Sequence, residues 1–320
     1  MDHFQLPRRT AAEHSTCLRD LFLEALHAVG YFDHIAAGAS EAHARSAMPA
    51  AAVGGLRLLT DTAPTLNPET DGGIYLPAGH DAAKSNRLSD AVLSHSVLAG
   101  LGARLIVVPA APPPTMPEAP AGALYARVSR YDVVKPAAFS LLADGDSVAD
   151  SALPIARASI DLSEMPTYSF RVAMSRAQQR EFGLGFLSAE LEQAIALGVA
   201  RTADAVLVKA LEAATLPAFS LGAAAAAGCA FSDLRAVVGS AGAGAAANLG
   251  GLYVLGIAAE MVQDATQTLV GTWQRAAIAI HEDIRLICDR RSVEGDMALT
   301  AHFNAQALIP DLGYFFQVAP

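Results

Sequence analysis

A long stretch of alternation near the end of the 320-residue chain restricts its fold more than any other segment. From Met297 to Ile309 the side chains follow the period of two that is typical of a β-strand. One face carries Leu299, Ala301, Phe303, Ala305, Ala307 and Ile309, and the other carries Thr300, His302, Asn304 and Gln306. At about 3.3 Å per residue this strand spans about 40 Å, well beyond the usual length of about five or six residues. It predicts an elongated body.

The neighbouring segments predict further strands. Before the long strand, one apolar face predicts a strand through His281-Glu282-Asp283. That face consists of Ile278, Ile280, Ile284, Leu286 and Cys288. Val270-Gly271-Thr272-Trp273 predicts a turn that leads into this region. Pro310-Asp311-Leu312-Gly313 predicts a turn before a last, aromatic strand at 314–318.

A long helix is predicted upstream, over 188–214. Ser188 can cap its first turn, where Glu190 and Glu192 suit the helix dipole, and Pro217 follows its end. The apolar positions with helical spacing are Leu191, Ile195, Val199, Val206 and Ala210. At 1.5 Å per residue the helix is about 40 Å long, so it matches the long strand and can pack along it.

In this order the segments resemble the major capsid proteins of tailed bacteriophages, the Hong Kong 97-like family. That family's chain closes with a valine-glycine-aromatic segment, two strands, an acidic loop at Glu294-Gly295-Asp296, a long strand, and a proline-aromatic segment. Upstream, Asp71-Gly72-Gly73-Ile74-Tyr75-Leu76-Pro77 resembles the family's glycine-glycine entry, and 89–108 the helix and strand that follow it. The segment 140–175 resembles its two-stranded projection, with a polar tip at 144–147 and a return arm through Tyr168, Phe170, Val172 and Met174.

The resemblance implies that Trp273 lies inside the domain body, with a binding-surface aromatic as the less favoured alternative. It also implies an α+β Hong Kong 97-like fold with four parts. These are an N-terminal arm or scaffolding-like segment at 1–71; a peripheral domain at 72–124, 176–215 and 285–309 with the spine helix 188–214; an extended loop at 125–175; and an axial domain at 216–284 and 310–320. The shape of the axial domain is left open, because a compact Gly/Ala-rich run stands between Leu234 and Leu255.

The function implied by the resemblance is structural, not enzymatic. The chain is expected to self-assemble as pentamers and hexamers into an icosahedral shell that encloses double-stranded DNA without sequence-specific binding. Portal, scaffolding and decoration proteins are implied as further partners, and the virion, assembled in the host bacterial cytoplasm, as the location. Two alternatives stay open: the shell of an encapsulin-type nanocompartment, and a cytosolic enzyme with a cofactor pocket in the Gly-rich segment.

Some members of that family cross-link neighbouring subunits through a lysine and an asparagine. The lysines here are Lys84, Lys135 and Lys209, none of which lies at the predicted loop tip, and the long strand starts beside Asp296 instead of an asparagine. We therefore predict no such isopeptide bond. A ladder of covalent multimers from assembled particles on a denaturing gel would contradict this.

Composition agrees with subunit contacts. The chain is 52% hydrophobic and 17% charged, which leaves a surface poor in charge for a free monomer. Its net charge of −10 argues against a basic nucleic-acid-binding surface. Cys17, Cys229 and Cys288 fit neither a zinc site nor a disulfide framework, and Cys288 is expected in the core.

Four groups of residues were weighed as sites, and for each the structural interpretation is favoured. The histidines His14, His27, His34 and His43 lack metal-ligand spacing. His281, Glu282 and Asp283 are expected to alternate across a strand, so they cannot converge on a substrate. Gly239–Gly244 lacks a phosphate-loop ending, and Ser175, Ser188 and Ser240 lack a nucleophile-elbow context. We predict no catalytic, cofactor-binding or metal site.

One uncharged stretch, 236–259, is long enough to cross a bilayer. Its six glycines, its alanines and Asn248 favour a tightly packed turn-and-strand region, with a membrane span as the less favoured alternative. No membrane partner is therefore expected.

Overall fold

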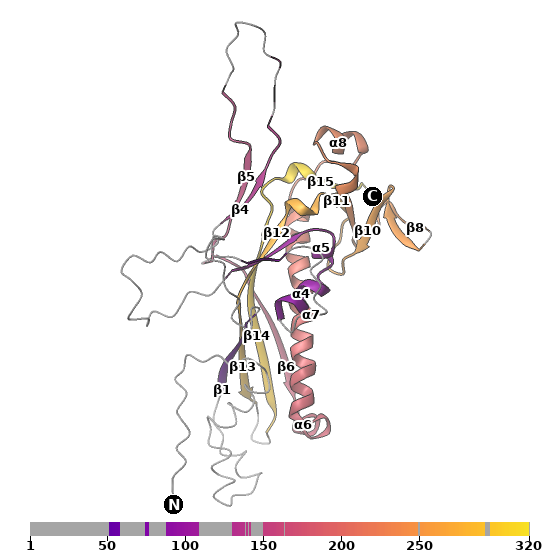
Figure 1. The fold of residues 1–320 in the computed structure, drawn as a ribbon. Helices are drawn as coiled ribbons and strands as arrows, with labels where there is room; N and C mark the ends of the chain where they lie inside the picture. Colours follow the sequence, from indigo (N-terminus) through magenta and orange to yellow (C-terminus); the bar gives the residue numbers. More distant parts are fainter. Residues whose placement is uncertain are drawn as a thin grey trace, which may run out of the picture.

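The computed structural model describes residues 51–57, 74–76, 88–108, 130–137, 139, 141, 150–162, 164–248, 250–291 and 295–319. The architecture is mixed α+β and elongated (Figure 1). A long helix runs beside a long sheet, a second sheet lies next to one end of that helix, and a two-stranded hairpin points away from the body. The predicted α+β class is confirmed.

The long sheet has seven strands. Its order is β1-β13-β14-β12-β3-β2, with β6 paired to β14 as well. The strands are β1 Ala51–Arg57, β2 Ile74–Leu76, β3 Arg104–Val108, β6 Thr167–Met174, β12 Ala277–His281, β13 Asp283–Arg290 and β14 Met297–Leu308. The predicted long strand is β14, and it ends one residue before the predicted boundary.

The strand predicted through His281-Glu282-Asp283 is wrong at these residues. His281 ends β12 and Asp283 begins β13, and both strands run antiparallel to β14. Between the pairs Ile280↔Ala305 and Arg285↔His302, two extra residues form a bulge. Side chains alternate between the two faces of a strand, so two extra residues leave Ile280 and Ile284 on the same buried face. The apolar alternation therefore continues across the bulge, and the sequence does not indicate where β12 ends.

The predicted spine helix is confirmed, but its start is not. Helix α7 covers Leu184–Ala213, so Ser188 lies inside it instead of capping it. The preceding helix α6, Arg176–Phe182, begins with a capping box in which Ser175 and Gln178 each accept from the other's backbone N–H. Gly183, at φ 74°, separates α6 from α7, a backbone angle that glycine adopts easily.

Helix α7 packs along the sheet. At 1.5 Å per residue its 30 residues span about 45 Å, which matches β14. Two short helices, α4 (Leu88–His95) and α5 (Val97–Gly100), lie against α7. The main core fills the space between these helices and the long sheet. It includes Ile195, Val199, Leu207 and Leu211 of α7 and Leu299, Ala301, Phe303 and Ala305 of β14.

The second sheet has six strands in the order β15-β11-β7-β10-β9-β8. These are β7 Arg235–Val238, β8 Ala245–Asn248, β9 Gly251–Val254, β10 Ile257–Met261, β11 Leu269–Gly271 and β15 Phe315–Gln317, with α8 at Leu221–Ala226 nearby. The Gly/Ala-rich run is thus a turn-and-strand region, as predicted. A Cβ at Gly239 would lie 2.6 Å from the Gln267 carbonyl oxygen, so the backbones meet there because the residue has no side chain.

Trp273 joins the two sheets. It starts the short 3₁₀ turn η3 (Trp273–Arg275) and is fully buried, as predicted. Its Nε1 donates to the Arg235 carbonyl oxygen at 3.0 Å, and its ring meets Phe315 edge to face at 5.6 Å. Two further turns, η2 (Phe231–Asp233) and η4 (Leu312–Tyr314), complete this region.

The predicted two-stranded projection is wrong in its pairing. The hairpin consists of β4 (Arg130–Val134) and β5 (Ile155–Ser159), which pair with each other alone. The predicted return arm, from Tyr168 to Met174, lies in β6 and pairs with β14 along its whole length. Its alternating side chains pack toward the main core, where Met174 is buried. The predicted tip at 144–147 lies outside the described residues.

Candidate interaction surface

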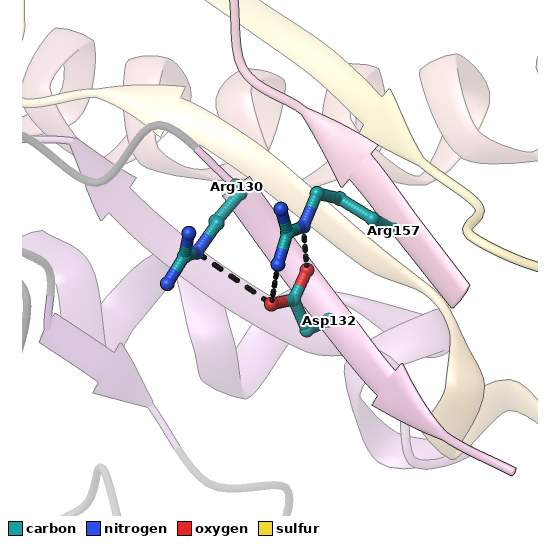
Figure 2. A network of polar contacts seen from close by, with 3 residues as sticks. All are labelled: Arg130, Asp132 and Arg157. Atoms are coloured by element: carbon teal, nitrogen blue, oxygen red, sulfur yellow. Dashed lines mark hydrogen bonds and ion pairs between the residues drawn. The ribbon is translucent and has the colours of Figure 1, made fainter. Parts of the chain in front are cut away.

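The β4–β5 hairpin, whose strands pair through their backbones, carries an exposed ion-pair cluster (Figure 2). Arg157 donates from Nε to Asp132 at 2.7 Å and from Nη2 at 3.0 Å, in a bidentate arrangement across the two strands. Arg130 approaches the same carboxylate at 3.5 Å. The hydrogen bonds from Arg157 lower the pKa of Asp132 from its usual value. The cluster fixes the register Asp132↔Arg157 and leaves one cation in excess.

Polar contacts attach the base of the hairpin to the body. Tyr131, which is buried, donates its hydroxyl to the Gln274 carbonyl oxygen at 3.1 Å. Lys135 forms an ion pair of 2.7 Å with Asp311. Burial alone would raise the pKa of Asp311, but the Lys135 and Gly313 hydrogen bonds outweigh it and the pKa is lowered. These contacts give the hairpin a defined direction relative to the body.

Beyond its base, the hairpin segment exposes large apolar side chains. Phe139 is 97% exposed, Leu141 is fully exposed and Leu153 is 76% exposed. Apolar groups of this size normally lie in a core, and a cluster of exposed ones marks an interaction site. Between 136 and 156 the sequence also holds three aspartates and no lysine or arginine. The hairpin therefore offers apolar side chains within an acidic segment.

A groove lies on the body, between α7 and the strands β6 and β14. It is a cavity of about 550 Å³, and its apolar floor includes Ile195, Val199 and Phe303. Phe170 of β6 lines it and is 45% exposed. Gly198 and Ala194 of α7 also line it, and such small side chains leave the space open. The groove can receive apolar side chains from outside the chain.

The groove has a polar rim that includes Arg201, Lys209 and Asp264. Arg201 binds the Asp264 carboxylate with two hydrogen bonds, at 2.8 and 3.0 Å, and these lower the pKa of Asp264. Among these three rim groups Lys209 is the cation in excess. Its charge is complementary to the acidic hairpin segment.

A buried carboxylate stabilises the body beneath this surface. Asp204 of α7 accepts from Ser96 Oγ at 2.6 Å and from Val97 N at 2.8 Å, so it caps α5 from a different helix. Burial raises its pKa to about 6, although these hydrogen bonds oppose the shift. Nothing in the sequence pattern of α7 indicated this role, because an aspartate among apolar helix positions also fits a solvent-facing turn.

The side chains weighed as catalytic in the sequence have structural places. Ser175 caps α6, and the backbone N–H of Asp283 donates to His281 Nδ1 at 3.2 Å within the bulge. Ser240 and the glycines around it form the turn after β7. Cys288 is buried, and burial raises its pKa to about 12, so its thiol is unreactive near neutral pH.

Other sequence predictions fall outside this region. The four weighed histidines, Lys84 and the arm 1–71, apart from β1, lie outside the described residues. Asp296 accepts from the Arg176 backbone N–H at 3.0 Å. The sequence predicts a projecting segment with a polar tip, but the signal for an interaction surface there is the presence of Phe139 and Leu141 in a turn-rich stretch.

Within the residues that the structure describes, no helix is long and apolar enough to cross a bilayer. In the same residues, no three side chains of His, Cys, Asp or Glu gather in a way that could hold a metal ion.

Solved structures of capsids and of a virus-like particle are similar to this chain. No protein-family model and no curated protein sequence matches the chain. The satellite phage P4 procapsid with its size-determination protein is similar at 11% identity and a TM-score of 0.43, over 72% of this chain and 96% of that one. The capsid of a native GTA particle is similar at 14% identity and a TM-score of 0.41, over 60% and 86%. A virus-like particle from Pyrococcus furiosus is similar at 8% identity and a TM-score of 0.39, over 72% and 96%.

Proposed function

We propose that this chain is the major capsid protein of a tailed phage or prophage, a subunit that assembles into an icosahedral shell around double-stranded DNA. The observation that carries the proposal is the combination of a stiff, elongated body with an anchored hairpin whose apolar side chains have no cover within the described residues. A subunit of this kind gains stability when a second copy covers them.

The body supplies the rigidity that a shell needs. Helix α7 and strand β14 pack side by side over their length, and the sheet continues on both sides of β14. Such an element resists bending because the backbone hydrogen bonds and the core would both have to deform. Copies joined through this rigid unit of α7 and the long sheet meet at fixed angles, as the closed pentamers and hexamers of a shell require.

The hairpin supplies the contact to the neighbouring copy. Tyr131 and Lys135 fix its base, and strands β4 and β5 point away from the body (Figure 1). We infer that Phe139 and Leu141 enter the groove of the next copy, with the acidic segment facing Lys209. Burial of apolar area stabilises by about 25 cal/mol per Å². Repeated around a shell, many such modest contacts add up through multivalency.

The net charge of the chain fits a shell that encloses DNA better than a protein that binds DNA sequence-specifically. With a net charge of −10, copies of the chain do not neutralise phosphates, and the enclosed DNA stays unbound to the wall. Portal, scaffolding and decoration proteins would complete the particle, which would assemble in the host bacterial cytoplasm. The role is structural and not enzymatic.

Within this proposal, the four-part division keeps its predicted limits except where strands were reassigned. The long sheet and α7 are the peripheral domain, the second sheet is the axial domain, and β4–β5 is the extended loop. Residues 1–71, apart from β1 in the long sheet, would provide an arm that grips neighbouring copies.

The proposal is tested by the size of the purified full chain in sedimentation velocity. We expect particles far larger than a small oligomer, and a Phe139→Ser/Leu141→Ser variant that sediments as a single folded chain. Phe231→Ser, which changes a 63% exposed aromatic residue in the 3₁₀ turn η2, is the matched control and should assemble. A wild type that stops at a dimer or tetramer would contradict the proposal. Particles that contain an enzyme instead of DNA would favour the nanocompartment shell.

A further inference from the structure

A buried carboxylate attaches α5 to the long helix α7. Asp204 lies inside α7 and is 3% exposed. Its Oδ1 accepts from Ser96 Oγ at 2.6 Å, and its Oδ2 accepts from the Val97 backbone N–H at 2.8 Å. A longer bond of 3.3 Å joins the Leu98 N–H to Oδ1, and Ser96 Oγ accepts in turn from the Ala99 N–H at 3.1 Å. The three donors to this carboxylate therefore belong to the first turn of α5 and its cap.

The segment that these bonds hold is too short to be stable by itself. Helix α4 has eight residues and α5 has four, and isolated helices shorter than about 12–15 residues are marginal in water. Both lie against α7, and Val92, Leu93 and Leu98 are buried in the main core. Strand β14, in contrast, is paired with β13 on one side and with β6 on the other. We therefore expect α4–α5 to open locally while the long sheet stays folded.

The end of α5 is connected to the attachment of the hairpin. After α5 the chain turns at Gly102, where φ is 112°, and enters β3. A Cβ at Gly102 would lie 2.9 Å from Gln274 Cγ, so the backbone of this turn packs directly against Gln274. The carbonyl oxygen of Gln274 is the acceptor for the Tyr131 hydroxyl of the hairpin. Opening of α5 therefore removes support from the residue that holds the hairpin base.

Hydrogen bonds, and no opposite charge, face the Asp204 carboxylate. Burial raises its pKa to about 6, its hydrogen bonds oppose the rise only in part, and no charged side chain of the described residues contributes. Helix α5 holds no titratable residue, and the His95 side chain that ends α4 is exposed. On α7, Arg201 is paired with Asp264, and Lys209 is exposed. An ionised carboxylate regains its hydration when α5 moves away, so ionisation favours opening.

We propose that Asp204 is a proton-dependent clasp, which holds α4–α5 on α7 while its carboxyl group is protonated and lets this segment open more often once the group is ionised. The clasp acts within one chain, so it does not rest on the shell proposed above. Because the pKa is about 6 in the closed form and 3.8 in water, closure is strongest below pH 4 and weakens as the pH rises through about 6. The hairpin base is therefore supported more firmly in mildly acidic solution than in neutral solution.

Amide hydrogen exchange of the full chain, corrected for the intrinsic effect of pH on exchange, tests the clasp. The opening constant of residues 96–103 should rise by about tenfold or more between pH 4.5 and pH 7.5 and level off above pH 7. At pH 7.5 it should also exceed the opening constant of β14 by about tenfold or more, because α4–α5 opens without the long sheet. An opening constant of residues 96–103 that does not change with pH, or that equals the constant of β14, would overturn the clasp.

Three variants identify the group that titrates. Asp204→Asn cannot ionise, so the pH dependence of residues 96–103 should vanish. The matched control Asp264→Asn removes a different carboxylate, which pairs with Arg201 of α7, and should keep the dependence of the wild type. Ser96→Ala removes one donor to the ionised carboxylate, so the midpoint should move to higher pH, a result that is decisive even if Asp204→Asn does not fold. Persistence of the dependence in Asp204→Asn, its loss in Asp264→Asn, or an unmoved midpoint in Ser96→Ala would overturn the proposal.

Discussion

The long-sheet body and the β4–β5 hairpin use apolar residues in opposite ways. In the body, Leu299, Phe303 and their neighbours on α7 are buried against one another. In the hairpin segment, Tyr131 and Ala158 near the base pack against the long sheet, whereas Phe139 and Leu141 further out face solvent. The body therefore draws its stability from within the chain. The outer part of the hairpin contributes little to the stability of the single chain, and its exposed apolar side chains would be stabilised when a second copy covers them.

The largest expected effect concerns the body. Replacing Trp273 by alanine removes a fully buried ring that packs on Phe315 and bonds to the Arg235 carbonyl oxygen. We expect a loss of about 3–5 kcal/mol in the free energy of unfolding. Urea unfolding followed by circular dichroism measures it. A loss below about 1 kcal/mol would show that the ring does not join the two sheets.

The next effect is a pH dependence from Asp204. Its pKa rises from 3.8 to about 6 on folding, so the folded chain binds the proton more tightly than the unfolded chain. The resulting stability is fully present below pH 4 and is lost as the pH rises through about 6. At about 1.4 kcal/mol per pKa unit the total is about 3 kcal/mol.

This prediction is measured with Asp204→Asn. Other carboxylates titrate equally in both proteins and cancel in the difference. The wild type should lose up to about 3 kcal/mol relative to the variant between pH 4 and pH 7. A difference in unfolding free energy that stays constant over this range would contradict the burial of an ionised Asp204.

A smaller effect is expected at the junction between the two regions. Lys135→Ala removes the ion pair with Asp311, in which the lysine is 44% exposed and the carboxylate 18%. Because such pairs are screened by water, the unfolding free energy should fall by about 0.2–1 kcal/mol. The hairpin should lose part of its fixed direction. The rate of assembly should therefore fall clearly, even though the free energy of unfolding changes little. Light scattering during assembly checks this, and an unchanged rate would contradict the anchoring role.

The smallest effect on stability belongs to the hairpin itself. Phe139→Ser/Leu141→Ser alters exposed side chains, so the unfolding free energy of the single chain should change by less than about 0.5 kcal/mol. Lys209→Glu on the groove rim should weaken association while it leaves the fold unchanged. If either variant assembled as the wild type does, the hairpin would not be the part that gains from a neighbour.

The parts of this molecule that could be predicted from sequence are those with a strong period. Strand β14 and helix α7 carry two-fold and helical spacing over many residues, and both were found nearly in full. The strand alternation also predicts that Cys288 lies in the core, whereas the buried position of Trp273, which stands in a turn, was implied by the family resemblance.

The wrong predictions concern segments whose local pattern is compatible with more than one strand pairing. Strand β6 alternates as a hairpin arm would, and alternation does not show that its partner is β14. The bulge between β12 and β13 keeps the apolar residues on one face, so it leaves no trace in the pattern. The groove and the Asp204 contact depend on residues more than 100 positions apart, which no local period reveals.

Negative-stain electron microscopy of the purified full chain tests the central claim most directly. Closed particles of uniform diameter, which disappear in the Phe139→Ser/Leu141→Ser variant while the protein stays soluble and folded, are the predicted result. A field of small discrete oligomers from the wild type, or closed particles that persist in the variant, would contradict the account.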